Sequence, residues 1–104
     1  MKIVDVLKAL ADNNRLAIMC YLQSGTRCVC EIEQILSITQ SATSKHLNKL
    51  RLVGLIKAEK KAQWVHYSIP DDVYVEYPFL EKLLSDANKL YVFDAGKVKE
   101  FYDC

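Results

Sequence analysis

The sequence has few of the residues on which several functional classes depend. Among its 104 residues are three glycines, two prolines and two histidines. No glycine-rich phosphate-binding loop and no set of nucleophile, base and acid is visible, so we expect the protein not to be an enzyme. Charged residues interrupt the longest apolar stretches, which excludes a membrane span, and Asp5 and Lys8 lie where a signal peptide needs its apolar segment. We therefore expect a cytoplasmic protein.

The composition is that of a single globular domain, with 51% hydrophobic and 26% charged residues over residues 1–104. A chain of this size buries a little over ~60% of the surface that it exposes when unfolded, so a dimer interface would add stability. Four cysteines are present. Without an export signal, cysteines favour metal binding, redox sensing or burial over a disulfide framework.

Positive charge is concentrated in the middle of the chain. The formal net charge is +1, yet residues 45–61 have six basic side chains and one acidic side chain, whereas residues 71–104 have four basic and eight acidic ones. A basic segment in an otherwise neutral or acidic small domain indicates a site for a polyanion such as nucleic acid. A solvated lysine-rich face would give the same pattern, so charge alone leaves both interpretations open.

Hydrophobic spacing predicts helices through the first part of the chain. Apolar residues recur at helical spacing from Ile3 to Leu10, and Asp12 is the expected N-cap of a second helix that ends near Gly25. A third helix is predicted at about residues 28–36.

A fourth predicted helix completes a helix-turn-helix at about residues 28–52, with Thr39 as its N-cap. Its outward face is polar and basic, so it can enter a DNA major groove, whereas a pure interaction module would show an apolar patch there. Glutamine and serine can bond base edges, and lysine can also meet phosphates. On this helix and on the tip of the hairpin that follows, the expected DNA-binding residues are Gln40, Ser41, Ser44, Lys45, His46, Lys49, Lys60, Lys61 and Gln63. For His46, packing or a phosphate contact is favoured over metal binding.

The period of the hydrophobic pattern changes after Gly54. Two strands are predicted within about residues 55–69, joined by a turn at Lys61-Ala62-Gln63. A long amphipathic helix opened by Pro78, with a tail after it, is expected within about residues 71–104. The predicted fold class is therefore mainly α with a small β-hairpin, a winged helix-turn-helix that dimerises through its terminal helices.

Four runs of the sequence together resemble the ArsR/SmtB family of metal-responsive winged-helix repressors. They are LKALADNNRLAIMCYLQSG, CVCEIEQIL, TQSATSKHLNKLRLVGLI and QWVHYSI, within about residues 5–69. The resemblance implies a homodimer that binds an inverted-repeat operator in double-stranded DNA and releases it when an inducer binds. The family's S-x-H pattern falls on Ser44 and His46, and its wing tyrosine on Tyr67. The family usually has a glycine in the wing turn, where this sequence has Lys61-Ala62-Gln63.

The pair Cys28 and Cys30 opens the third predicted helix, directly after Arg27. A helix N-terminus and a neighbouring arginine stabilise thiolates, so the pair is a candidate soft-metal site. The alternative, two small core side chains, requires one of them to point away from the apolar face. The spacing is similar to the arsenite-sensing branch of the family, whose motif E-x-C-V-C-[DE]-L-C implies three thiolates around As(III) or Sb(III). The third position is occupied here by Glu33, a hard ligand.

The third ligand therefore stays open between Cys104, Cys20 and none. Cys104 ends the tail, which could fold back or cross the dimer, and Cys20 lies on an apolar stretch where burial is expected. Both histidines precede the last long helix, so we do not expect the Zn, Ni or Co site that other family members have there. We expect no constitutive cofactor and arsenite or antimonite as inducer. The alternative is a thiol-redox or persulfide-responsive repressor of the same fold.

Overall fold

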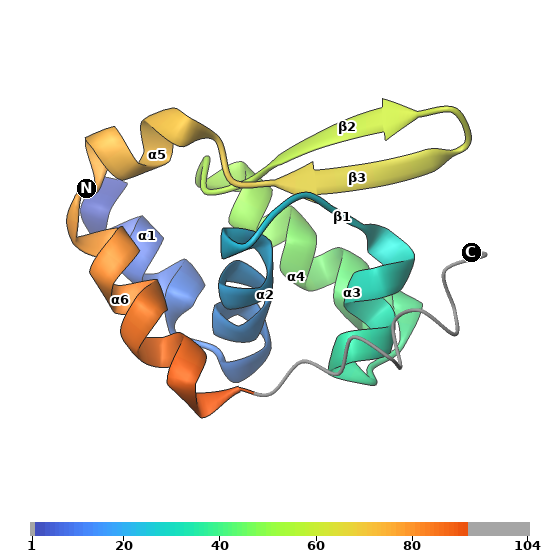
Figure 1. Ribbon diagram of the computed structural model, residues 1–104, viewed down its shortest axis with the longest axis horizontal. Coiled ribbons are helices and arrows are strands. Elements are labelled where there is room, and N and C mark those ends of the chain that lie inside the picture. The colour runs from blue at the N-terminus through green and yellow to red at the C-terminus, as the bar shows by residue number, and fades with distance from the viewer. Residues whose placement is uncertain (1, 92–104) are drawn as a thin grey trace.

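The structure, a computed structural model, describes residues 2–91 (Figure 1). Cys104 and the rest of the predicted tail lie outside these residues. The arrangement of a helix-turn-helix followed by a β-hairpin confirms the predicted fold class. In chain order the elements are α1 (Lys2–Leu10), α2 (Asn13–Gln23), β1 (Arg27–Cys28), α3 (Val29–Leu36), α4 (Gln40–Leu52), β2 (Lys57–Lys61), β3 (Trp64–Ser68), α5 (Asp71–Glu76), α6 (Phe79–Ala87) and the 3-10 helix η1 (Asn88–Leu90).

The two predicted N-caps are confirmed. The Asp12 carboxylate accepts hydrogen bonds from the backbone N–H groups of Asn14 and Arg15, at 2.9 Å and 3.0 Å. The Thr39 hydroxyl accepts one from Ala42 N at 3.1 Å. Each side chain satisfies donors that the first turn of a helix leaves unpaired, which explains where α2 and α4 begin.

The hairpin belongs to a three-stranded antiparallel sheet in the order β1-β3-β2. The strand β1 was not predicted, because a strand of only two residues has no alternation of polar and apolar side chains. The first hairpin strand was predicted to begin at Leu55, and this is wrong: β2 begins at Lys57. Leu55 and Ile56 lie in the core, so their apolar character reflects burial ahead of the strand.

The predicted length of the helix after Pro78 is also wrong, because the observed helix is shorter. A separate helix, α5, precedes it, and α6 ends at Ala87. Pro70 with Asp71 and Asp72 begins α5, because proline suits a helix start and carboxylates in the first turn favour the positive end of the helix dipole. Tyr91 has an extended backbone and lies beyond the helical residues.

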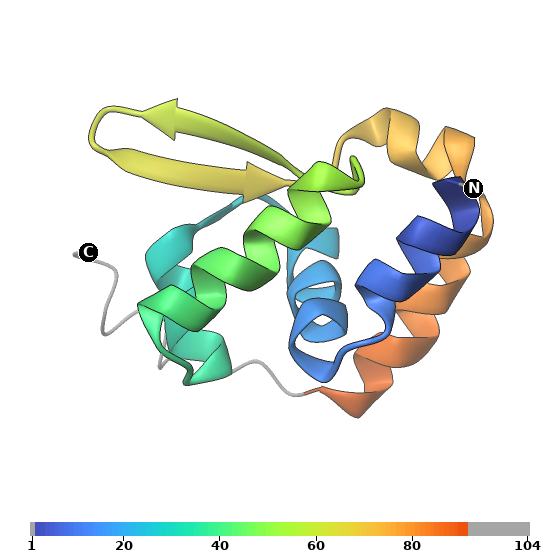
Figure 2. The same ribbon diagram turned by 180° about the vertical axis from the view of Figure 1, so that it is seen from behind.

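The core surrounds α2, which lies between α1 and α6 on one side and α3 and α4 on the other (Figures 1 and 2). Residues 17–22 of α2 are all buried, so this helix has no solvent face along that stretch. The largest fully buried side chains that pack around it include Ile32, Leu47, Leu50, Leu55, Leu80 and Leu84. None of the helices within residues 2–91 has the length and hydrophobicity of a membrane span.

Apolar side chains remain exposed at one end of the molecule, where α1 and α6 lie in both views (Figures 1 and 2). We call this set the terminal apolar face; it consists of Ile3, Val4 and Leu7 on α1, Val75 on α5, and Phe79 and Leu83 on α6. Its α1 and α6 members are between 36% and 48% exposed. The first and last helices were predicted to hold a dimer together, and this face provides the apolar surface that such an interface needs.

Candidate nucleic-acid interface and thiol site

The recognition surface predicted on α4 is exposed. Thr43, Leu47 and Leu50 point into the core and fix the orientation of the helix. Thr43 adds a hydrogen bond from its hydroxyl to Thr39 O at 2.9 Å. The structure thereby brings five of the predicted DNA-binding residues to the outward side of the helix: Gln40, Ser41, Ser44, Lys45 and Lys49.

The wing lies beside this surface. Every residue of β2 is exposed, including Lys60 and Lys61, and so is Gln63 in the turn. In both views the tip of the hairpin lies toward the same side of the molecule as the first turn of α4 (Figures 1 and 2). The predicted base-reading and phosphate-binding residues therefore belong to two elements that a single duplex can meet together.

Ala62, at the tip of the wing, has a backbone conformation that is unusual for a residue other than glycine. Lys61 pairs with Trp64 at the end of the ladder, so the turn consists of Ala62 and Gln63. Ala62 has a φ of 57°, in the left-handed region. This conformation costs a non-glycine residue about 1–2 kcal/mol, which gives a physical reason for the glycine usual in the family.

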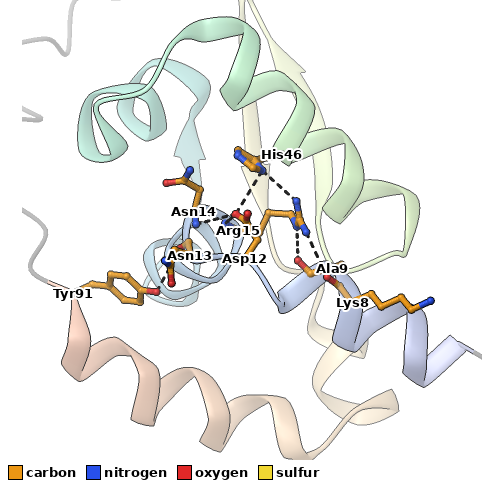
Figure 3. Close-up of polar contacts among 8 residues, drawn as sticks. All are labelled: Lys8, Ala9, Asp12, Asn13, Asn14, Arg15, His46 and Tyr91. Atoms are coloured by element: carbon orange, nitrogen blue, oxygen red, sulfur yellow. Dashed lines mark hydrogen bonds and ion pairs between the residues drawn. The ribbon is translucent and has the colours of Figure 1, made fainter.

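His46 differs from the other predicted DNA-binding residues, because it faces α2. Its side chain is only 18% exposed, and its Nδ1 lies 3.3 Å from Arg15 Nη1 and 3.7 Å from Asp12 Oδ2 (Figure 3). The hydrogen bond from Arg15 N, with smaller effects of the His46 and Arg15 charges, holds the pKa of Asp12 below its ordinary value despite partial desolvation. Asp12 was predicted only as a helix cap and Arg15 was not predicted to have a role, since nothing local links these residues to His46, which lies 31 positions after Arg15.

Cys28 and Cys30 meet at the start of α3. Cys28 is the N-cap, and its sulfur accepts a hydrogen bond from Cys30 N at 3.4 Å. Its backbone N–H donates to Glu31 Oε1 at 2.8 Å, which completes a capping box. The two Sγ atoms are 2.7 Å apart. Both sulfurs therefore lie close enough to bind one and the same atom.

The side chain of Arg27, whose charge was expected to act on the two cysteines, lies over an aromatic ring. Adjacent strand residues point to opposite faces, and Arg27 pairs with Tyr67 while Cys28 pairs with His66. The Arg27 guanidinium stacks on the Tyr21 ring at 4.4 Å.

His66 lies across from Cys28 in the sheet. Directly opposite residues of an antiparallel pair share a face, with Cβ atoms about 4.5–5.5 Å apart. Its Nδ1 is buried and makes no hydrogen bond with the part of the chain that the structure describes. His66 is therefore a neighbour of the Cys28 and Cys30 pair.

Among the described residues, only the sulfurs of Cys28 and Cys30 come together as possible ligands of a soft ion. Within residues 2–91, no group of three or more His, Cys, Asp or Glu side chains is arranged to hold a metal ion. Cys20 is only 2% exposed and its thiol donates to Leu84 O at 3.6 Å. Burial raises the pKa of Cys20 to about 11, so it stays protonated near neutral pH. The predicted burial of Cys20 is confirmed, and Cys104 lies outside the described residues.

The fold and these residues together define a winged helix-turn-helix DNA-binding protein, and comparison with known proteins gives its family. Residues 12–58 match the family described as "Bacterial regulatory protein, arsR family". The chain is 46% identical over 66 residues to the arsenical resistance operon repressor of Bacillus subtilis, a match that covers 62% of this chain and 63% of that protein, less than two thirds of its length. It is 38% identical over 89 residues to the transcriptional activator HlyU of Vibrio cholerae, covering 85% of this chain and 82% of HlyU.

Solved structures agree. HlyU from Vibrio cholerae matches with a TM-score of 0.68 over 79% of this chain and 90% of that one, at 38% identity. A homodimeric winged helix-turn-helix DNA-binding domain from Mycobacterium bovis matches with a TM-score of 0.70 over 83% of this chain and 80% of that one, at 27% identity. The chain belongs to the arsR family of bacterial regulatory proteins, which confirms the resemblance identified in the sequence.

Proposed function

We propose that the chain is a homodimeric transcriptional repressor, acting in the cytoplasm, whose inducer is As(III) or Sb(III). It binds an inverted-repeat operator in double-stranded DNA and releases it when the metalloid binds Cys28 and Cys30, with Cys104 as the third ligand. The observation that carries this proposal is the 2.7 Å approach of the Cys28 and Cys30 sulfurs at the start of the helix-turn-helix.

DNA binding is supported by the exposed polar face of α4 and the basic wing. Gln40, Ser41 and Ser44 are exposed and offer groups that can bond base edges, whereas the exposed charges of Lys49, Lys60 and Lys61 would neutralise phosphates. Each neutralised phosphate releases counterions, so these lysines contribute affinity that falls as salt rises.

Dimerisation is supported by the terminal apolar face, which a second copy of the chain would cover. A dimer presents two α4 helices to the DNA, and helix-turn-helix dimers read half-sites one helical turn, about 34 Å, apart. Two-fold symmetry of the protein then corresponds to an inverted repeat in the operator. The relative from Mycobacterium bovis is described as homodimeric.

The metalloid is supported by the donor set. Thiolates are the ligands that soft ions prefer, and a helix N-terminus favours the thiolate form. Each As–S bond that forms from As(OH)3 replaces one hydroxide, which leaves as water with the proton of the thiol. A relative that is 46% identical to this chain is named as an arsenical resistance operon repressor.

Release follows from the position of Cys28 as the N-cap of α3. When the Cys28 side chain turns to bind the metalloid, the hydrogen bond that its sulfur accepts from Cys30 N is strained, and losing such a cap would cost a helix about 0.5–2 kcal/mol. The start of α3 then shifts, and α4, which follows after a short turn, shifts relative to its dimer mate. A coupling of ~1–3 kcal/mol is enough to weaken operator binding about 5- to 150-fold.

The same approach of the two sulfurs favours a second candidate function, a thiol-redox or persulfide-responsive repressor. An oxidant would take two electrons from Cys28 and Cys30, two protons would leave, and one S–S bond would form. A solved structure of a relative at 38% identity is described as reduced HlyU.

Operator release from the reduced dimer separates these functions. A duplex that the protein selects from a randomised library is labelled, and its fluorescence anisotropy is followed during titration with arsenite, zinc, hydrogen peroxide or a persulfide donor. We expect arsenite to release the DNA and the double variant Cys28→Ser/Cys30→Ser to be insensitive. Cys104→Ser tests the third ligand, and Cys20→Ser is the matched control.

Release by oxidant or persulfide alone would favour the second candidate function. A protein that selects no duplex from the library would contradict both.

A further inference from the structure

Arg15 joins the end of α1 to the start of α2 (Figure 3). Its Nε donates to Ala9 O at 2.5 Å, and its Nη2 donates to Lys8 O at 3.4 Å. Both carbonyls belong to the last turn of α1, where a helix leaves carbonyl groups without their usual helical partner, and Lys8 O also accepts from Ala11 N at 3.2 Å. The guanidinium therefore caps α1 and is held in one orientation.

A third N–H of the same guanidinium reaches the recognition helix. Arg15 Nη1 lies 3.3 Å from Nδ1 of His46. Arginine stays protonated and only donates, so Nδ1 must be the acceptor of this hydrogen bond. A neutral imidazole that accepts at Nδ1 has its proton on Nε2. The position of Arg15 thus selects one tautomer of His46.

Asp12 does not compete for this nitrogen. Its Oδ2 is 3.7 Å from His46 Nδ1, farther than Arg15 Nη1, and already accepts hydrogen bonds from Asn14 N and Arg15 N. Both contacts of the imidazole therefore run through Nδ1, and Nε2 lies on the side of the ring away from Arg15.

Cationic groups gather beside His46. Lys49 is one turn further along α4, and it lines a shallow groove of about 300 Å³ together with Lys8, Arg15 and the carboxylate of Asp5. His46 lies at the edge of the outward face of α4, where a recognition helix meets the DNA backbone more readily than the base edges.

We propose that Arg15 is a positioning residue for DNA binding, which acts by holding His46 with its proton on Nε2 so that this N–H donates to a phosphate of the DNA backbone. The proposal rests on the DNA binding proposed above and is independent of the inducer. Because the donor is neutral, the contact adds affinity without releasing a counterion.

Two substitutions of His46 test the roles of its two ring nitrogens one at a time. The amide of asparagine reaches the place of Nδ1, so His46→Asn keeps the contact with Arg15 and loses the donor at Nε2. The amide of glutamine reaches the place of Nε2, so His46→Gln has the opposite effect. At pH 8 without arsenite, we expect His46→Asn to bind the selected duplex about tenfold more weakly, since a hydrogen bond to a charged group is lost. Its melting temperature and the salt dependence of its binding should match those of the wild type.

The tautomer itself provides a readout that a merely structural role would not change. In protein labelled with ¹⁵N-histidine, the imidazole nitrogen shifts at pH 8 should show the proton of His46 on Nε2, with the resonances assigned from the His46→Asn spectrum. Arg15→Lys keeps the charge, but one ammonium group cannot take the place of the guanidinium fork. We expect this variant to lose the tautomer preference and to bind DNA several-fold more weakly. Arg51→Lys, on the same helix as His46, is the matched control.

The outcomes are distinguishable. A His46 proton on Nδ1 in the wild type, or a His46→Asn variant that binds the duplex as tightly as the wild type, overturns this proposal alone. A wild-type protein that selects no duplex overturns the proposed function and this proposal with it.

Discussion

The two halves of the molecule use the same residue type for different purposes. In the half formed by α2 and α6, Cys20 is buried against Leu84 and behaves as a small apolar side chain. In the half formed by α3, α4 and the wing, Cys28 caps a helix and its sulfur lies 2.7 Å from that of Cys30. The difference shows that surroundings decide the role of a cysteine: burial raises the pKa of Cys20 and keeps its thiol protonated, whereas the sulfur of Cys28 lies at a helix N-terminus beside a second sulfur.

The two halves also differ in how far their side chains are exposed to solvent. The contact of α2 with α6 is dominated by fully buried side chains such as Ile18, Leu80 and Leu84. By contrast, β2 is exposed at every position, and α4 is exposed along one side. Substitutions of the buried side chains should therefore change stability, and substitutions of the exposed polar side chains on α4 and β2 should change DNA binding.

The largest effect is expected from Leu84→Ala on α6. Leu84 is fully buried, so truncation removes apolar contacts and leaves a cavity, which costs about 2–5 kcal/mol of unfolding free energy. Urea denaturation measures this loss. Leu90→Ala is the matched control: Leu90 is 77% exposed, and its truncation should change stability by less than about 0.5 kcal/mol. An equal loss in both variants would contradict the assignment of Leu84 to the core.

The next effect concerns the reactivity of Cys20. With its pKa raised from 9.0 to about 11, its thiolate population at pH 8 is about 100-fold below that of an ordinary thiol. In the reduced native protein, iodoacetamide should therefore label Cys20 last, as followed by mass spectrometry. The folded state holds the proton of the Cys20 thiol more tightly than the unfolded state does. The contribution of this thiol to stability is therefore complete below pH 9 and is lost as the pH rises toward about 11. Cys20→Ala should remove that part of the loss of stability at alkaline pH. Rapid labelling of Cys20 in the native protein would contradict its assignment as a buried, protonated thiol.

A smaller effect is expected at the wing. Lys60→Ala and Lys61→Ala should each reduce the slope of log affinity against log salt by about 0.9, because each removes one phosphate contact. Anisotropy titrations of the selected duplex at several salt concentrations measure the slope. Lys82→Ala on α6 removes the same charge from the other half and should leave the slope unchanged. Equal slopes in all three variants and the wild type would exclude the wing from the interface.

The smallest effect is expected at the tip of the wing. Ala62 has a left-handed backbone, so Ala62→Gly removes a steric penalty and should raise the unfolding free energy by up to about 1 kcal/mol. Ala58→Gly within β2 should lower it by about 0.5–1 kcal/mol, since glycine weakens a regular strand. Thermal unfolding of both variants tests the opposite signs.

The sequence was sufficient for those elements that local rules determine. Asp12 and Thr39 were identifiable as N-caps because their side chains bond the backbone two or three residues ahead. The outward face of α4 followed from helical spacing. The short helix α5 was missed although Pro70, Asp71 and Asp72 form a helix-start signal, because the same residues also end the preceding strand.

Contacts between distant segments could not be predicted in this way. Arg15 and His46 are 31 residues apart, and β1 forms only because Cys28 pairs with His66. The role of Cys28 as a cap was also hidden, since cysteine is not among the residues that usually cap helices.

The most direct test of the central claim is to count the sulfur atoms around the bound metalloid. Arsenic X-ray absorption of the reduced protein loaded with one As(III) per chain gives that number. We predict three sulfur neighbours in the wild type, two in Cys104→Ser, and an unchanged environment in Cys20→Ser. An arsenic atom surrounded by oxygen alone, or one whose sulfur neighbours persist in Cys28→Ser/Cys30→Ser, would contradict the account.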